Sequence, residues 1–261
     1  MDESGPRRAA RLHHELSGPD GAPVLVLSNS LGTTGEIWDG QLPALRERFR
    51  VLRYDHRGHG GSEVPPGPYT LAELGRDLLA LLDGLGIGRV SLCGLSLGGM
   101  VGMWLAAHAP ERVERLALVS TSARLGPPEM WTERAAVARE KGTAALTETA
   151  ASRWFTSRFR RHEPETVARI LATLAATPGE GYAGCCEAIA AMDLRPDLSR
   201  VTAPTLVVVA LDDPATPPPH ADVIVEGIHH ARRELVLDAS HLVSVEEPER
   251  ITALLLEHLG G

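Results

Sequence analysis

Short apolar runs bounded by turn residues recur along the chain and indicate strands separated by helices. The runs are rich in Val and Leu and too short for helices, a pattern typical of strands buried on both faces. They occupy residues 24–28, 51–54, 90–93, 116–120, 206–210 and 235–237. An earlier strand-like segment, 11–16, precedes the run at 24–28 too closely for a crossover helix. We therefore predict that these two segments pair as an antiparallel hairpin at the edge of the sheet.

Longer segments between the runs carry apolar residues at helical spacing. The clearest is 70–85, where Thr70 and Glu73 form a predicted capping box and Gly84 or Gly86 can end the helix. Its apolar face consists of Leu71, Leu74, Leu78, Leu81 and Leu85. The alternation of strands and helices predicts an α/β fold with a mostly parallel sheet and helices on both faces.

Between residues 124 and 197 the strand pattern stops, and only helical stretches broken by Gly and Pro remain. We interpret this segment as a helical cap inserted into an α/β core made of residues 1–123 and 198–261. The cap holds ten basic and ten acidic residues, so the net charge of −8 belongs to the core, with 16 basic against 24 acidic residues. An anionic ligand is therefore expected on the cap side.

Composition narrows the class of protein further. With 261 residues and 43% hydrophobic positions, the chain can bury a core, while its net charge of −8 argues against nucleic-acid or anionic-membrane partners. The three cysteines, Cys93, Cys185 and Cys186, lack metal-ligand spacing and suit a reducing compartment. No signal-peptide segment and no apolar run near the roughly 20 residues of a membrane span is present. We expect a cytoplasmic protein that binds a small molecule; its oligomeric state stays open.

The strongest chemical motif is Gly-Leu-Ser-Leu-Gly at residues 94–98, placed between a predicted buried strand and an apolar helical segment. This is the nucleophile elbow in its strand–turn–helix setting. A sharp turn of this kind leaves no room for side chains two positions to either side of the serine, which explains both glycines. Ser96 is therefore the candidate nucleophile; the alternative is an ordinary serine at a helix start.

A serine hydroxyl needs a positioned base, and the base needs an orienting acid. In this architecture the acid and then the base follow the serine along the chain. His241 comes just after the last predicted strand and is the candidate base. Asp212 and Asp213 both follow the preceding strand, but adjacent residues on an extended segment point opposite ways. We predict Asp213 as the acid, because the proline after it favours an extended conformation, and assign Asp238 to a turn.

The other histidines are expected to be structural. His56 and His59 lie in the loop DHRGHGGS, where packing is the favoured role. Five more stand in polar surroundings or near a helix end: His13, His14, His108, His229 and His230.

Acyl transfer also requires donors for a tetrahedral oxyanion. These are usually the backbone amide after the nucleophile and one from the loop after an early strand. The candidates are the amides of Leu97 and of Leu31, the latter in the segment NSLGT. The alternative for Leu31 is a plain turn residue.

Together these features resemble the α/β-hydrolase superfamily over nearly the whole chain. Within it, the segments NSLGT, YDHRGHGGS, GLSLGG and DDPATPP, with the cap segments 153–155 and 181–195, are similar to the 3-oxoadipate enol-lactonases. The resemblance implies hydrolysis of 3-oxoadipate enol-lactone to 3-oxoadipate in the β-ketoadipate pathway of aromatic degradation. It also implies a Ser-His-Asp triad that works with no metal or cofactor.

An anionic lactone bound to an acidic core needs a local positive charge. Trp131 and Arg134 stand three residues apart on one face of a predicted helix, and Trp154 can form an apolar wall. We predict that these three residues bind the substrate, with Arg134 on its carboxylate. The alternative places Arg134 at the surface, paired with Glu129 or Glu133.

Other functions share the triad. A generalist carboxylesterase, a cofactor-free perhydrolase and a hydrolase-fold ligand receptor are the alternatives, because a fold does not fix a function.

Overall fold

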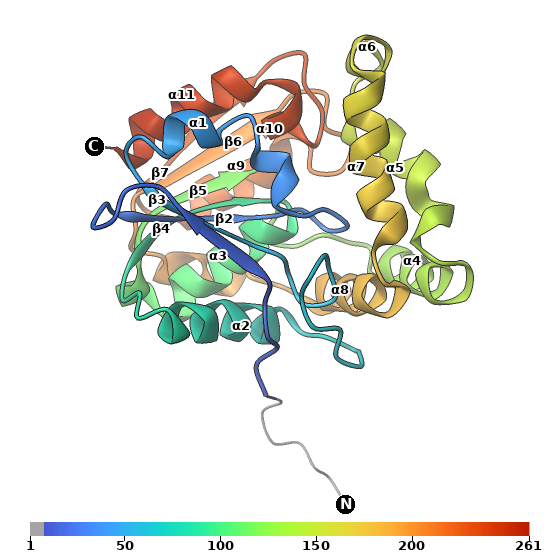
Figure 1. Ribbon diagram of the computed structural model, residues 1–261, viewed down its shortest axis with the longest axis horizontal. Coiled ribbons are helices and arrows are strands. Elements are labelled where there is room, and N and C mark those ends of the chain that lie inside the picture. Colours follow the sequence, from blue (N-terminus) through green and yellow to red (C-terminus); the bar gives the residue numbers. More distant parts are fainter. Residues whose placement is uncertain (1–7, 261) are drawn as a thin grey trace, which may run out of the picture.

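The computed structural model describes residues 8–260 and contains a seven-stranded sheet with helices on both faces (Figure 1). The spatial order is β1-β3-β2-β4-β5-β6-β7, with β1 antiparallel and every other pair parallel. The strands are β1 (His14–Ser17), β2 (Val24–Ser28), β3 (Arg50–Tyr54), β4 (Val90–Leu95), β5 (Val113–Val119), β6 (Thr205–Ala210) and β7 (Ala231–Val236). The predicted mostly parallel sheet is confirmed.

The predicted pairing of the first strand is wrong. β1 pairs with β3, in a register that sets His14 against Tyr54, rather than with β2. Both sides of β2 are occupied, by β3 and β4. The reason is burial: β2 is almost wholly buried and needs two neighbours, whereas β1 is exposed or half-buried and suits an edge.

The helices connect and cover the strands. In Figure 1, α1 and α11 lie over one face of the sheet, and α2 and α3 lie over the opposite face. The core is centred on β4, in which all six residues are buried. The helices are α1 (Leu42–Leu45), α2 (Leu71–Gly84), α3 (Leu97–His108), α4 (Pro128–Lys141), α5 (Thr147–Trp154), α6 (Ser157–His162), α7 (Pro164–Ala176), α8 (Gly179–Ala191), α9 (Pro218–Gly227), α10 (Val243–Glu246) and α11 (Pro248–Leu259). Four short 3-10 helices span Gly35–Trp38, Pro110–Arg112, Thr143–Leu146 and Arg195–Arg200.

The helix predicted at residues 70–85 is α2, and its predicted capping box is present. The Thr70 hydroxyl accepts a hydrogen bond from the Glu73 amide, and the Glu73 carboxylate accepts one from the Thr70 amide at 2.8 Å. Two amides at the start of the helix are thereby satisfied reciprocally, which fixes where α2 begins.

Helices α4 to α8 gather on one side of the sheet (Figure 1), and residues 124–197 contain no strand. α4 packs on α8, and α8 meets the loop after β3 through bare backbone: a Cβ on Gly181 would lie 2.2 Å from the Gly58 carbonyl oxygen. The division into core and cap at residues 124 and 197 stays a prediction.

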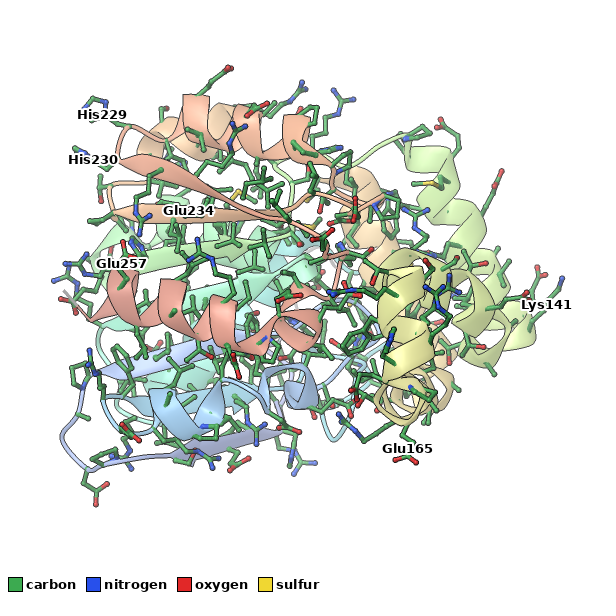
Figure 2. The ribbon with its side chains drawn as sticks, turned by 90° about the horizontal axis from the view of Figure 1, so that it is seen from above. Lys141, Glu165, His229, His230, Glu234 and Glu257 are labelled. Carbon is green, nitrogen blue, oxygen red and sulfur yellow. The ribbon has the colours of Figure 1, made fainter. Side chains whose placement is uncertain are left out.

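Labelled side chains mark the two ends of the molecule in Figure 2. Lys141 and Glu165 lie on the cap, and His229 and His230 point outward at the opposite end. Both histidines are exposed, as expected for solvated side chains. Among residues 8–260 no helix combines the length and apolar character needed to cross a bilayer.

Candidate active site

Ser96 lies on a strained turn between β4 and α3. Its backbone angles are φ 55° and ψ −114°, a conformation that residues with a side chain rarely adopt. The turn has no space beside it, because a Cβ on Gly94 would lie 2.2 Å from the Gly98 carbonyl oxygen. One on Gly98 would lie 2.2 Å from that of Ser28. The structure thus requires both glycines of the motif, as the sequence predicts.

Asp213 and His241 are brought together from the loops after β6 and β7. Nδ1 of His241 lies 2.8 Å from Oδ2 of Asp213, and both side chains are buried. Asp213 also accepts hydrogen bonds from the Ala215 and Thr216 amides and from the Thr216 hydroxyl. Burial raises the pKa of Asp213, but the charge and hydrogen bond of His241 and the other donors outweigh it and lower the pKa to about 2. Asp212 is exposed, so only Asp213 contacts the histidine.

Ser96 and His241 line one narrow cavity between the sheet and the cap, with a volume of about 30 Å³. Such a space holds about one water molecule, so a larger ligand needs the lining side chains to move. All the predicted cap residues reach this cavity. Its walls include Leu31, Trp131, Arg134, Arg153, Trp154 and Tyr182.

Two backbone amides near Ser96 are available to a ligand. Within residues 8–260, neither the Leu31 nor the Leu97 amide donates a hydrogen bond to a protein acceptor. The amides that follow them, of Gly32 and Gly98, are both bonded within the protein. Because Leu31 borders the cavity and Leu97 directly follows Ser96, the two free donors suit a developing negative charge on a ligand oxygen.

His59 supports the segment that carries the Leu31 amide. Its Nε2 accepts a hydrogen bond from the Gly32 amide at 2.9 Å, and its Nδ1 lies 3.2 Å from the Arg57 carbonyl oxygen. These partners assign the proton to Nδ1. Burial lowers the pKa of His59 to about 4, so the ring is neutral near pH 7. The structural role predicted for His59 is therefore to hold the turn that carries Leu31, through its bond to the Gly32 amide.

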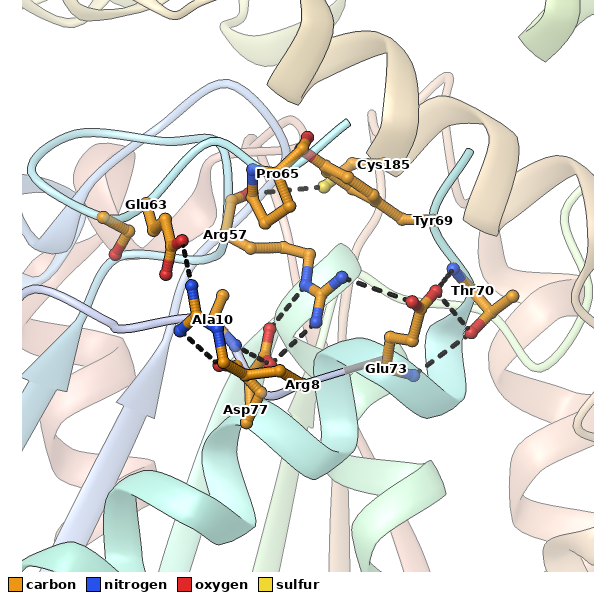
Figure 3. A network of polar contacts seen from close by, with 12 residues as sticks. Arg8, Ala10, Arg57, Glu63, Pro65, Tyr69, Thr70, Glu73, Asp77 and Cys185 are labelled. Atoms are coloured by element: carbon orange, nitrogen blue, oxygen red, sulfur yellow. Dashed lines mark hydrogen bonds and ion pairs between the residues drawn. The ribbon is translucent and has the colours of Figure 1, made fainter. Parts of the chain in front are cut away.

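A buried ion pair fixes the loop that carries His59 (Figure 3). The Arg57 guanidinium contacts both oxygens of Asp77 in α2, at 2.5 and 2.8 Å, and lies 3.5 Å from Glu73. On the cap side, the Cys185 thiol donates to the Arg57 carbonyl oxygen at 3.8 Å. These contacts bond the loop to α2 on one side and to α8 on the other.

Trp131 and Arg134 pack together on α4. The Arg134 guanidinium carbon lies 5.4 Å from the centre of a Trp131 ring, a cation–π contact. Arg134 forms no ion pair within residues 8–260, so the alternative pairing with Glu129 or Glu133 is not observed. The structure thus leaves the Arg134 charge beside the cavity.

Arg153 is a cavity residue that the sequence analysis did not identify. It is half-buried in α5, and within the described part of the chain it has no carboxylate partner. Burial and the neighbouring charge of Arg134 lower the pKa of Arg153, and the charge of Asp213 offsets part of this lowering. The signal in the sequence was its position next to Trp154, but the helical pattern does not show which face of α5 meets the sheet. Two neighbouring cations therefore border the cavity, and within residues 8–260 neither forms an ion pair.

The arrangement suits acyl transfer through a serine. A carboxylate bonded to an imidazole, a serine on a strained turn and two free amides are the groups that this chemistry requires. Within residues 8–260, no group of three or more His, Cys, Asp or Glu side chains is placed to hold a metal ion.

Comparison with known proteins defines the class. A family described as the alpha/beta hydrolase fold matches residues 23–248, and the chain belongs to this family. It is 42% identical to 3-oxoadipate enol-lactonase 2 of Acinetobacter baylyi, over 91% of this chain and 89% of that protein. The crystal structure of the enol-lactonase from Burkholderia xenovorans LB400 has a TM-score of 0.94 and 43% identity, over 97% of both chains. A protein of Stutzerimonas stutzeri, provisionally named carbamate hydrolase RutD, is 32% identical over 95% of this chain and 96% of its own length.

Proposed function

We propose that this hydrolase opens 3-oxoadipate enol-lactone, an unsaturated lactone ring with an acetate arm, to 3-oxoadipate. The observation that carries the proposal is a pair of cations, Arg134 and Arg153, that border the same cavity as Ser96 and His241. Neither cation forms an ion pair in the part of the chain that the structure describes. Guanidinium groups bind carboxylates through two parallel hydrogen bonds. The names of the relatives from A. baylyi and B. xenovorans support the same substrate.

In the first step the Ser96 hydroxyl oxygen attacks the lactone carbonyl carbon, while His241 takes the hydroxyl proton. Asp213 holds the imidazole in the tautomer with a proton on Nδ1 and stabilises the cation that forms. The carbonyl oxygen becomes negative and accepts hydrogen bonds from the Leu31 and Leu97 amides.

In the second step the ring C–O bond breaks, and the leaving enolate oxygen takes the proton from His241. This oxygen is a good leaving group because the negative charge of the enolate is delocalised onto carbon. The enol then tautomerises to the ketone. Water attacks the acyl-serine ester with His241 as base, and its oxygen becomes part of the new carboxylate. Ser96 recovers its proton, so the cycle needs no other reactant.

We place this reaction in the cytoplasm, where reduced thiols persist. The three cysteines are buried free thiols, which suits such a compartment.

The test compares steady-state kinetics on three substrates. The first is the enol-lactone, the second is the same ring with a methyl group in place of the acetate arm, and the third is a small carbamate. We expect kcat/KM for the acidic lactone to exceed that for the methyl lactone by about 10-fold or more, because the arginines bind only the former. Equal kcat/KM values for the two lactones would show that the two arginines do not select the acidic substrate. A higher value for the carbamate would instead favour the activity named for the S. stutzeri relative.

A further inference from the structure

The loop that carries His241 is hydrogen-bonded to the cap segment that carries Arg153. The Ser240 hydroxyl donates to the Arg153 carbonyl oxygen at 3.0 Å. The Leu242 amide donates to the Trp154 carbonyl oxygen, also at 3.0 Å. These two contacts lie on either side of His241 in the chain, so the histidine stands in a short stretch of backbone tied to α5 at both ends.

Glu246, at the end of α10, joins the same two segments with its side chain. One carboxylate oxygen accepts hydrogen bonds from the Thr156 amide at 2.7 Å and the Thr156 hydroxyl at 2.9 Å. The other accepts one from the Ser240 amide at 2.5 Å. The side chain is buried, and each oxygen serves a different segment: one the cap, the other the residue before His241.

Only a carboxylate satisfies this arrangement. Three donors converge on two oxygens, and hydrogen bonds to an ionised acceptor are stronger than neutral ones. A glutamine of the same shape would turn its NH₂ group toward the amide of either Ser240 or Thr156. A donor would then face a donor in a buried place, and both groups would be left without an acceptor, which destabilises the contact.

We propose that Glu246 is a positioning residue: it fixes the His241 loop against the cap segment 153–156, so that the base and the Arg153 side chain keep one relative placement. This inference rests on the proposed function, because it assigns His241 as the base. Glu246 contacts neither the imidazole nor the cavity; it acts through the Ser240 and Thr156 backbone.

The test measures how fast and how completely phenylmethylsulfonyl fluoride labels Ser96. A misplaced base slows the labelling of every molecule, whereas partial unfolding lowers only the final extent. For Glu246→Gln we expect a labelling rate about 10- to 100-fold below that of the wild type with the same final extent. The values of kcat on both lactones should fall by a similar factor. The matched control is Glu247→Gln, which removes the next carboxylate, paired with Arg158 at 3.3 Å; its rate should equal that of the wild type.

A second pair of variants covers the case in which Glu246→Gln does not fold. Ser240→Ala removes the bond to the Arg153 carbonyl, together with a longer one to the Asp212 carbonyl at 3.3 Å, and should slow labelling about 5-fold. Ser152→Ala changes a serine of α5 that bonds only to the Thr149 carbonyl, and it should not slow labelling. A wild-type rate with reduced extent in Glu246→Gln, or a wild-type rate in Ser240→Ala, overturns the proposal. Labelling does not involve the lactone, so a wild type that is labelled but leaves the lactone intact refutes only the proposed substrate.

Discussion

Oδ2 of Asp213 accepts a hydrogen bond from Nδ1 of His241 over 2.8 Å, which leaves Nε2 as the basic nitrogen of the imidazole. An amide in place of the carboxylate can present its NH₂ group to Nδ1 and favour the opposite tautomer. Asp213→Asn should therefore lower kcat by about 1,000-fold or more with little change in fold. Steady-state hydrolysis together with circular dichroism checks both parts.

The control for that substitution is its neighbour. Asp212 is exposed, and its side chain does not contact the histidine, so Asp212→Asn should keep kcat within about 2-fold of the wild type. A large loss in Asp212→Asn with a small one in Asp213→Asn would show that the acid is the other aspartate.

Ser96 and His241 should behave as a unit. Ser96→Ala and His241→Ala should each lower kcat by about 10,000-fold or more, and the double variant should be scarcely worse, because either loss already abolishes the serine pathway. The rates of the three variants, measured at equal folded concentration, check this. Losses that multiply in the double variant would argue that the two residues act independently.

The sequence predicts those parts of the molecule that depend on local patterns. The nucleophile turn requires small residues at fixed offsets from Ser96, and the acid follows β6, which is recognisable as a buried run. The strand before the base, β7, is mostly exposed or half-buried, contrary to the prediction. The choice of Asp213 over Asp212 also rests on a local feature, the proline that follows Asp213 and favours an extended conformation there. These features need no knowledge of which elements meet in space.

What the sequence does not reveal depends on long-range contacts. The pairing of β1 with β3 places a strand between two segments that are neighbours in the chain, and no local pattern encodes that insertion. Arg153 borders the cavity where the carbonyl groups at the end of α5 bond the loop after β7, a contact between segments that are distant in the chain. Glu246 reads as an ordinary polar helix residue until its three donors, from two distant segments, are known.

The stability of the fold should fall as the pH drops below about 6.5. Burial lowers the pKa of His59 to about 4, and its neutral Nε2 accepts the Gly32 amide. An unfolded histidine binds a proton near pH 6.5, so below that pH the unfolded state gains the proton first. The stability that depends on neutral His59 is fully present above pH 6.5, declines as the pH falls from about 6.5 to 4, and is lost below about pH 4. Urea unfolding across this range measures it.

The matched variant is His59→Gln, which can still accept the Gly32 amide but does not titrate. Between pH 6.5 and 4, the slope of unfolding free energy against pH should be smaller than that of the wild type. The difference in slope should correspond to about one bound proton. His56 is also buried, with its pKa lowered to about 3, and titrates in both proteins. The charge of His59 is one cause of that lowering, but it acts only where His59 is protonated in the fold, below about pH 4 and outside the range compared. Parallel plots would mean that His59 does not stay neutral in the fold.

The two cavity arginines should discriminate between lactones that differ only in the carboxylate. Neither Arg134 nor Arg153 has an anionic partner in the described chain, so each is free to bind the acetate arm of the substrate. Arg134→Ala and Arg153→Ala should each raise KM for the acidic lactone roughly 10-fold or more, since a charged hydrogen bond contributes about 1.5–3 kcal/mol. KM for the methyl lactone should not change, because that ring offers no anion.

Arg134→Lys keeps the charge but cannot form two parallel hydrogen bonds, so its KM should fall between those of the wild type and the alanine variant. Equal losses on both lactones would instead mean that the substitutions disturb the cap, and no loss on either would exclude the arginines from binding.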